Sequence, residues 1–146
     1  EKERQYQEEF RPHLRLIDGL GEFLASSHET GIKLAIGSAA IMFNIDFVLD
    51  GLGIRSYFEA IVSADDVRKS KPHPETWLKC AEKLRLQPYQ CLVFEDSPKG
   101  AESALNAGMK SIIITNLHNV EEFTAYPNII GFNGDYRALS SIPESK

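Results

Sequence analysis

The stretch CLVFEDSPKGAESALNAGMKSIII, residues 91–114, contains an apolar run, a helical pattern and a second apolar run in direct succession. Cys91–Glu95 and Ser111–Thr115 are strand candidates, because their apolar residues are continuous, as in strands that are covered on both faces. Pro98 suits the first position of a helix and Gly108 suits its end. A strand, a helix and a strand joined this closely predict a parallel βαβ unit.

The rest of the chain repeats this alternation. Three more apolar runs are strand candidates: Lys33–Ser38, Ala60–Ser63 and Asn128–Phe132. Helical periodicity predicts helices over Asp18–Ser27 and Ala40–Leu52, and from Pro74 onward, where Trp77, Leu78, Ala81 and Leu84 share one face. The tail from 116 to 139 is expected to form a helix, a strand and a helix. The alternation predicts an α/β fold, with a doubly wound parallel sheet that carries helices on both faces.

Composition sets the broad class. With 146 residues, 42% hydrophobic and 25% charged, the chain is predicted to be one soluble globular domain or most of one. A net charge of -5 argues against a general nucleic-acid or anionic-membrane binder, which needs a clustered basic field. No apolar run approaches the length of a membrane span and no signal-peptide pattern opens the chain, so we expect a cytoplasmic protein. Cys80 and Cys91 are interpreted as small buried residues rather than a disulfide or a metal pair.

Polar residues directly after predicted strands are the candidates for function, because ligands of open α/β sheets bind at the carboxyl ends of the strands. Ser38 ends the first strand, and Ala39 follows it into a predicted helix. The Ser38 hydroxyl and the free N–H groups of that helix start would suit a phosphate. The alternative is that Ser38 is an ordinary helix cap.

A second candidate is Lys71, in the turn KSKPHP. Pro72 restricts Lys71 to an extended conformation and Pro74 can start the next helix, so the lysine is presented from a stiff turn. A lysine fixed in this way can neutralise a phosphate. The alternative is an exposed basic loop; Lys69 has the same charge but lacks the proline that follows Lys71.

The third candidate is the pair Glu95 and Asp96, at the end of an apolar strand. Two adjacent carboxylates repel each other and resist burial unless a positive group lies nearby. Mg²⁺, which prefers oxygen ligands, would explain both. The alternative is that Asp96 caps the helix that begins at Pro98 while Glu95 faces solvent.

The ordered set of Ser38, the Lys71–Pro72 turn and the acidic pair resembles the haloacid dehalogenase superfamily, and within it the β-phosphoglucomutase-like branch. The resemblance covers roughly residues 17–115, through the segments GIKLAIGSAA, LGIRSYFEAIVSADDVRKSKPHPETW, AEKL and CLVFEDSPKGAESALNAGMKSIII. It implies a Rossmann-like core and phosphoryl transfer on a small phosphorylated metabolite, a sugar phosphate being the expected class.

The resemblance also implies a role for each candidate. Ser38, with Ala39 beside it, would bind the phosphoryl group, and Lys71 would pair with the phosphoryl oxygens and with the nucleophile. Asp96 would bind Mg²⁺ directly, and Glu95 would bind it directly or through water. The lysine, the metal and the helix start would together stabilise the charge of the transition state.

The first motif of that family, an Asp-x-Asp pair that supplies the nucleophile and the general acid and base, does not occur in this sequence. In the family that motif lies on a central strand, between the strands that here end in Ser38 and Glu95, and a helical cap follows it. Because residue 1 is Glu, we expect the sequence to begin inside a longer polypeptide whose upstream segment carries both. Residues 1–12 would then be the end of the cap or a linker, and residues 13–146 the C-terminal part of the core.

The sequence therefore predicts part of a Mg²⁺-dependent phosphatase or hexose-phosphate mutase that is inactive without the upstream segment. The alternative function is a non-catalytic α/β domain that binds phosphate or a partner and has lost its nucleophile. A receiver-like signalling domain also combines acidic residues, a hydroxyl and a lysine, but the Lys-Pro-His-Pro turn and the late acidic pair argue against it.

Overall fold

The structure is a computed structural model that describes residues 20–115 and 118–137. All five predicted strands are present: β1 (Ala35–Gly37), β2 (Ala60–Val62), β3 (Leu92–Glu95), β4 (Lys110–Ile114) and β5 (Ile129–Asn133). The α-helices are α2 (Leu20–Glu29), α3 (Met42–Leu52), α4 (Glu75–Leu84) and α5 (Pro98–Asn106). Short 3₁₀ helices are η2 (Arg55–Tyr57), η3 (Ala64–Asp66), η4 (Pro88–Gln90) and η5 (Val120–Phe123). The predicted boundary between residues 12 and 13 lies outside the described residues.

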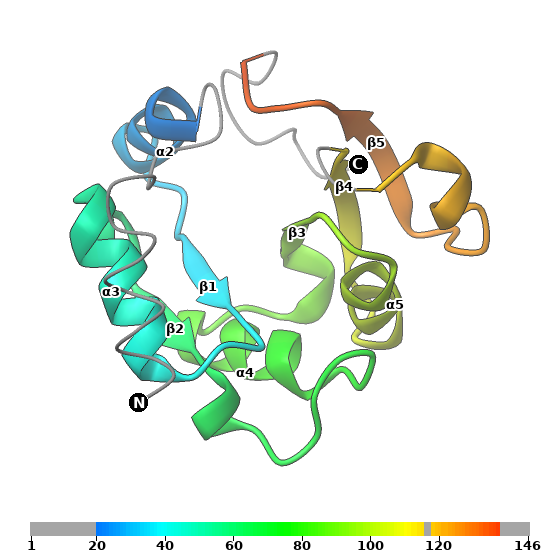
Figure 1. Ribbon diagram of the computed structural model, residues 1–146, viewed down its shortest axis with the longest axis horizontal. Helices are drawn as coiled ribbons and strands as arrows, with labels where there is room; N and C mark the ends of the chain where they lie inside the picture. The colour runs from blue at the N-terminus through cyan, green and yellow to red at the C-terminus, as the bar shows by residue number, and fades with distance from the viewer. Residues whose placement is uncertain (1–19, 116–117, 138–146) are drawn as a thin grey trace.

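The strands form two parallel sheets. β1 pairs with β2, and β3, β4 and β5 pair in that order. Within the described residues no backbone hydrogen-bond ladder joins β1 to β3 (Figure 1), although Lys71 contacts the last residue of each strand. The doubly wound arrangement is thus present as two separate parallel pieces.

Helices cover both faces of the β1–β2 pair, as the sequence predicted. Successive residues of a strand face opposite sides of a sheet. Ala35 and Val62 pack in a core cluster with Trp77 of α4. Ile36 and Ile61, their neighbours along the strands, pack in a second cluster that contains residues of α2 and α3. This alternation places α4 on one face and α2 with α3 on the other.

Three expectations for the helices need correction. α3 begins at Met42 rather than Ala40, because the chain is still extended at Ile41 and the Asp65 carboxylate accepts the Met42 N–H at 2.9 Å. Leu78 is 41% exposed and is not part of the buried face of α4. The helix expected before the last strand is the short 3₁₀ helix η5, and the end of the helix expected after it lies outside the described residues. No helix in the described ranges is long and apolar enough to cross a membrane.

Candidate active site at the ends of β1 and β3

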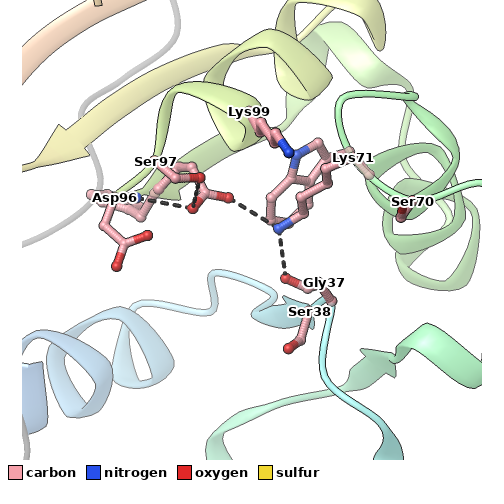
Figure 2. A pocket seen from close by; sticks show the side chains of 11 residues that line it. Gly37, Ser38, Ser70, Lys71, Asp96, Ser97 and Lys99 are labelled. Atoms are coloured by element: carbon pink, nitrogen blue, oxygen red, sulfur yellow. Dashed lines mark hydrogen bonds and ion pairs between the residues drawn. The ribbon is translucent and has the colours of Figure 1, made fainter. Parts of the chain in front are cut away.

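A cavity of about 560 Å³ lies where β1 and β3 end, and it contains every predicted site residue (Figure 2). Its lining residues are Gly37, Ser38, Ala39, Ser70, Lys71, Trp77, Phe94, Glu95, Asp96, Ser97 and Lys99. Because parallel strands present their carboxyl ends at one edge, residues far apart in the sequence meet here. The structure therefore brings Ser38, Ala39, Lys71, Glu95 and Asp96 together, as expected from their positions after strands.

Lys71 spans the gap between the two sheets. Its Nζ lies 3.0 Å from Oε2 of Glu95, the last residue of β3, and 3.3 Å from the carbonyl oxygen of Gly37, the last residue of β1 (Figure 2). The side chain of Lys71 is only 13% exposed and that of Glu95 only 10%. Lys69, the alternative cation, does not line the cavity; its backbone N–H is bonded to Glu75. Lys71 is thus a fixed, largely buried positive charge.

Glu95 is held by several donors at once. Besides the Lys71 ammonium at Oε2, its Oε1 accepts the Asp96 N–H at 3.0 Å and the Ser97 hydroxyl at 3.4 Å. Burial opposes ionisation, but the Lys71 charge and the Asp96 N–H outweigh it, and the pKa of Glu95 lies below its usual range. Lys71 therefore supplies the positive charge that the buried Glu95 carboxylate needs.

Asp96 differs from its neighbour. In the part of the chain that the structure describes, Asp96 forms no ion pair, and Figure 2 shows its carboxylate turned away from Lys71. Burial raises the pKa of Asp96, and the adjacent Glu95 carboxylate raises it further. Asp96 is not a helix cap either, since Ser97 Oγ accepts the Gly100 N–H at 3.1 Å at the start of α5. The alternative assigned to this pair, a capping Asp96 beside a solvent-facing Glu95, is wrong on both points.

A second, smaller cavity of about 220 Å³ adjoins the first. It is lined by Phe94, Glu95, Asp96, Ile114 and Tyr136. The Tyr136 ring packs against Phe94 and Phe23, with centroids 5.8 Å and 5.3 Å apart. Burial, with the two acidic neighbours, raises the pKa of Tyr136 to about 12. Asp96 therefore lies between two cavities, with a neutral phenol on one side.

Ser38 lies at the cavity, as predicted, but the helix expected to begin beside it starts later, at Met42. Ser38 Oγ accepts the Ala40 N–H at 3.0 Å in a short turn before α3, and the first N–H of α3 is bonded to Asp65. Ser38 therefore does not cap the helix, contrary to the alternative. As an acceptor in this bond, its hydroxyl keeps a hydrogen that can be donated into the cavity.

The carboxylate oxygens of the site fit part of the coordination shell of Mg²⁺. Asp96 offers a carboxylate without an ion-pair partner, the kind of hard oxygen ligand that Mg²⁺ prefers. Both oxygens of Glu95 already accept hydrogen bonds, which favours contact with an ion through water. Within residues 20–115 and 118–137, no group of three or more His, Cys, Asp or Glu could hold a metal ion. The described residues thus fit one side of such a site.

Ser70, Phe94, Ser97 and Lys99 line the cavity but were not identified from the sequence, and neither were Trp77 and Gly100, which shape the site. Trp77 was assigned to the apolar face of a helix, yet its ring also lines the cavity beneath Lys71. Gly100 lies so close to Glu95 that a methyl group there would overlap the carboxyl. Neither signal is visible in a single sequence, because periodicity reports burial and not the partner of a buried side chain.

Comparison with known proteins identifies relatives of this chain. The family model for haloacid dehalogenase-like hydrolases matches residues 1–114. Fructose-1-phosphate phosphatase YqaB of Escherichia coli K12 is 42% identical over 79 residues, which are 54% of this chain and 42% of that protein. Hexitol phosphatase B of the same strain is 36% identical over 107 residues, 73% of this chain and 47% of that protein. The chain thus spans about half the length of these curated relatives.

A solved structure supports the same assignment. β-Phosphoglucomutase from Clostridium difficile superposes with a TM-score of 0.72 at 28% identity, over 84% of this chain and 52% of that one. The fold, the family match and the phosphatase relatives agree with one another. The chain therefore belongs to the haloacid dehalogenase-like hydrolases, in their β-phosphoglucomutase-like branch.

Proposed function

We propose that the protein carries the phosphoryl-transfer core of a Mg²⁺-dependent enzyme that acts on small phosphorylated metabolites, a sugar phosphate being the expected class. Its activity would be that of a phosphatase or of a hexose-phosphate mutase. The observation that carries this proposal is the meeting of Ser38, Lys71 and Asp96 at one cavity. The relatives named above are a fructose-1-phosphate phosphatase, a hexitol phosphatase and a β-phosphoglucomutase, which supports the substrate class.

Two of the donors that line the cavity, Lys71 and Ser38, would act on the phosphoryl oxygens. An ammonium has three N–H bonds, and the Gly37 carbonyl and Glu95 accept two of those of Lys71. The third is available to an anion in the cavity, and Ser38 can donate its hydroxyl hydrogen from the end of β1. Fixed donors of this kind stabilise charge that develops in a transition state at little reorganisation cost.

Mg²⁺ would be bound directly by Asp96 and through water by Glu95. When bound, the ion would supply a further positive charge against the phosphoryl oxygens. Asp96 is suited to this role because its carboxylate is half-buried without an ion-pair partner, and a cation would lower its raised pKa.

The nucleophile is the remaining requirement. Of the described residues that line the cavity, only Glu95 and Asp96 are carboxylates, and both have the roles given above. We expect an Asp-x-Asp pair in a segment that precedes residue 1, on a strand that pairs with β1 and β3. Two unjoined parallel sheets with their ends at one cavity support this placement. Residues 1–146 alone would then be inactive, and that upstream segment would be their principal partner.

A second candidate is a domain that binds phosphate or a protein partner without catalysis. One observation favours this candidate. In the described residues, Glu95 and Asp96 do not belong to a group of three or more His, Cys, Asp or Glu side chains that could hold a metal ion. In that case the cavity would bind an anion but would not turn it over.

The two candidates are separated by an assay of the full gene product and of residues 1–146 side by side. Both are incubated with fructose 1-phosphate, hexitol phosphates and glucose 1-phosphate, with and without Mg²⁺. The proposal predicts Mg²⁺-dependent turnover by the full product only, with free phosphate from a phosphatase and an isomerised sugar from a mutase. Binding of inorganic phosphate without any turnover by either would support the non-catalytic domain.

A further inference from the structure

Trp77 forms the wall of the cavity against which Lys71 lies. The Lys71 Nζ is 4.2 Å from the centroid of the indole ring, within the range of a cation–π interaction. Both side chains are largely withdrawn from water, Trp77 being 8% exposed as a residue. The attraction between an ammonium and a ring face is stronger when water is excluded.

The ring itself is fixed on two sides. A methyl group on Gly37 would lie 2.6 Å from Trp77 Cζ3, so the indole packs directly on the backbone of β1. On the other side, the indole N–H donates to the Gly100 carbonyl oxygen of α5 at 3.4 Å. Trp77 therefore bridges the two halves of the fold, and its position is set by groups other than Lys71.

Lysine needs such support more than most residues. Its four-carbon side chain is flexible, and an ammonium is strongly hydrated, so an unsupported lysine at a cavity moves toward solvent. Here the Glu95 carboxylate and the Gly37 carbonyl accept hydrogen bonds from the ammonium, and the Trp77 ring packs against it. An aliphatic side chain could fill the same volume but would offer no negative ring face.

We propose that Trp77 is the positioning residue of Lys71, and that its ring keeps the ammonium at the cavity in the place where an anion is bound. This inference rests on the proposed function only for its consequence, since the position of Lys71 can be measured without any phosphate ester. The other interpretation, that Trp77 is merely a core residue, predicts a different pattern among variants.

The position of Lys71 can be measured by NMR of the lysine Cε methylene groups in the full gene product. A methylene next to an indole face is shifted upfield by the ring, and Lys71→Met identifies the resonance by its disappearance. We expect the shift in the native protein; because Trp77→Leu removes the ring that causes it, the effect of the variants is judged from phosphate affinity and not from this shift. Met109→Ala is the matched control, because Met109 is buried in the same core cluster and does not line the cavity.

The consequence is measured as the affinity for inorganic phosphate by calorimetry. Trp77→Leu is expected to weaken binding by about fivefold to thirtyfold, the range of a partly to fully desolvated cation–π contact. Trp77→Phe should retain most of the affinity, and Met109→Ala should bind as the native protein does.

Each result has one interpretation. If the native protein shows no upfield-shifted lysine methylene, or if Trp77→Phe and Trp77→Leu weaken phosphate binding equally, the positioning role is wrong; the first of these needs no variant that has to fold. If the shift is present but Lys71→Met binds phosphate as tightly as the native protein, positioning stands and the proposed phosphate role of Lys71 fails.

Discussion

Gly100 leaves space only for a hydrogen atom against the carboxyl of Glu95, because a methyl group at its Cα would overlap Cδ and Oε2. We therefore expect Gly100→Ala to push Glu95 from Lys71 and to lower the free energy of unfolding by about 1–3 kcal/mol, as overpacking does. Chemical denaturation measures this loss, and phosphate binding should weaken with it. Gly134→Ala is the control, since a methyl there meets nothing within 4 Å. Equal stability of the two variants would contradict the close approach.

Glu95→Gln should remove a stabilising ion pair whose strength depends on pH. The pKa of Glu95 is lower in the folded protein than in the unfolded chain, so its contribution is complete above the unfolded value of about 4.3 and is lost as pH falls through the folded value. At pH 7 the substitution should cost on the order of 3 kcal/mol, the loss typical when one partner of a buried pair is removed.

The measurement is urea denaturation of the native protein and of Glu95→Gln between pH 7 and pH 3. The difference in the free energy of unfolding should narrow below about pH 4. Lys71→Met in the Glu95→Gln background should restore part of the loss, because it removes the ammonium left without its partner. A difference that is constant over the whole range would show that the ion pair is not its source.

Asp96→Asn should separate activity from stability. The pKa of Asp96 is raised in the folded protein, so its ionised form destabilises the fold above the unfolded pKa, and this penalty is relieved as pH falls. The amide removes a half-buried charge that lies beside the Glu95 carboxylate, so the free energy of unfolding at pH 7 should stay equal or rise. In the full gene product, Mg²⁺-dependent turnover should be abolished. Near-normal turnover in this variant would refute the metal role of Asp96.

Ser97→Ala tests which residue caps α5. Ser97 accepts the Gly100 N–H, so its loss should lower the free energy of unfolding by about 1 kcal/mol. Asp96→Ala is the comparison, and because the Asp96 carboxylate caps nothing it should cost less. If Asp96→Ala lowered the free energy of unfolding more than Ser97→Ala, Asp96 and not Ser97 would be the cap of α5.

The strands were predictable because their signal is local. Each is a short apolar run ended by a polar or small residue, and all five predicted runs contain the observed strand or overlap most of it. The position of Ser38, Lys71 and the acidic pair followed from one rule, that parallel strands present their ends at a common edge.

What the sequence did not show depends on contacts between distant segments. The start of α3 was expected too early because Ala39 and Ala40 continue the helical pattern, while the cap that sets the true start is Asp65, more than 20 residues away. The two carboxylates were assigned together to Mg²⁺, and the structure adds an internal cation, Lys71, at Glu95.

In the ion pair with Lys71, the Glu95 carboxylate competes with any anion that binds in the cavity. A phosphoryl group that approaches Lys71 must share an ammonium that already has an anion at 3.0 Å, so measured affinity is the difference between two interactions of like kind. Protonation of Glu95 at acid pH would remove the internal anion, and binding of an anion whose own charge is unchanged there should tighten. The internal ion pair therefore weakens the binding of any anion to Lys71.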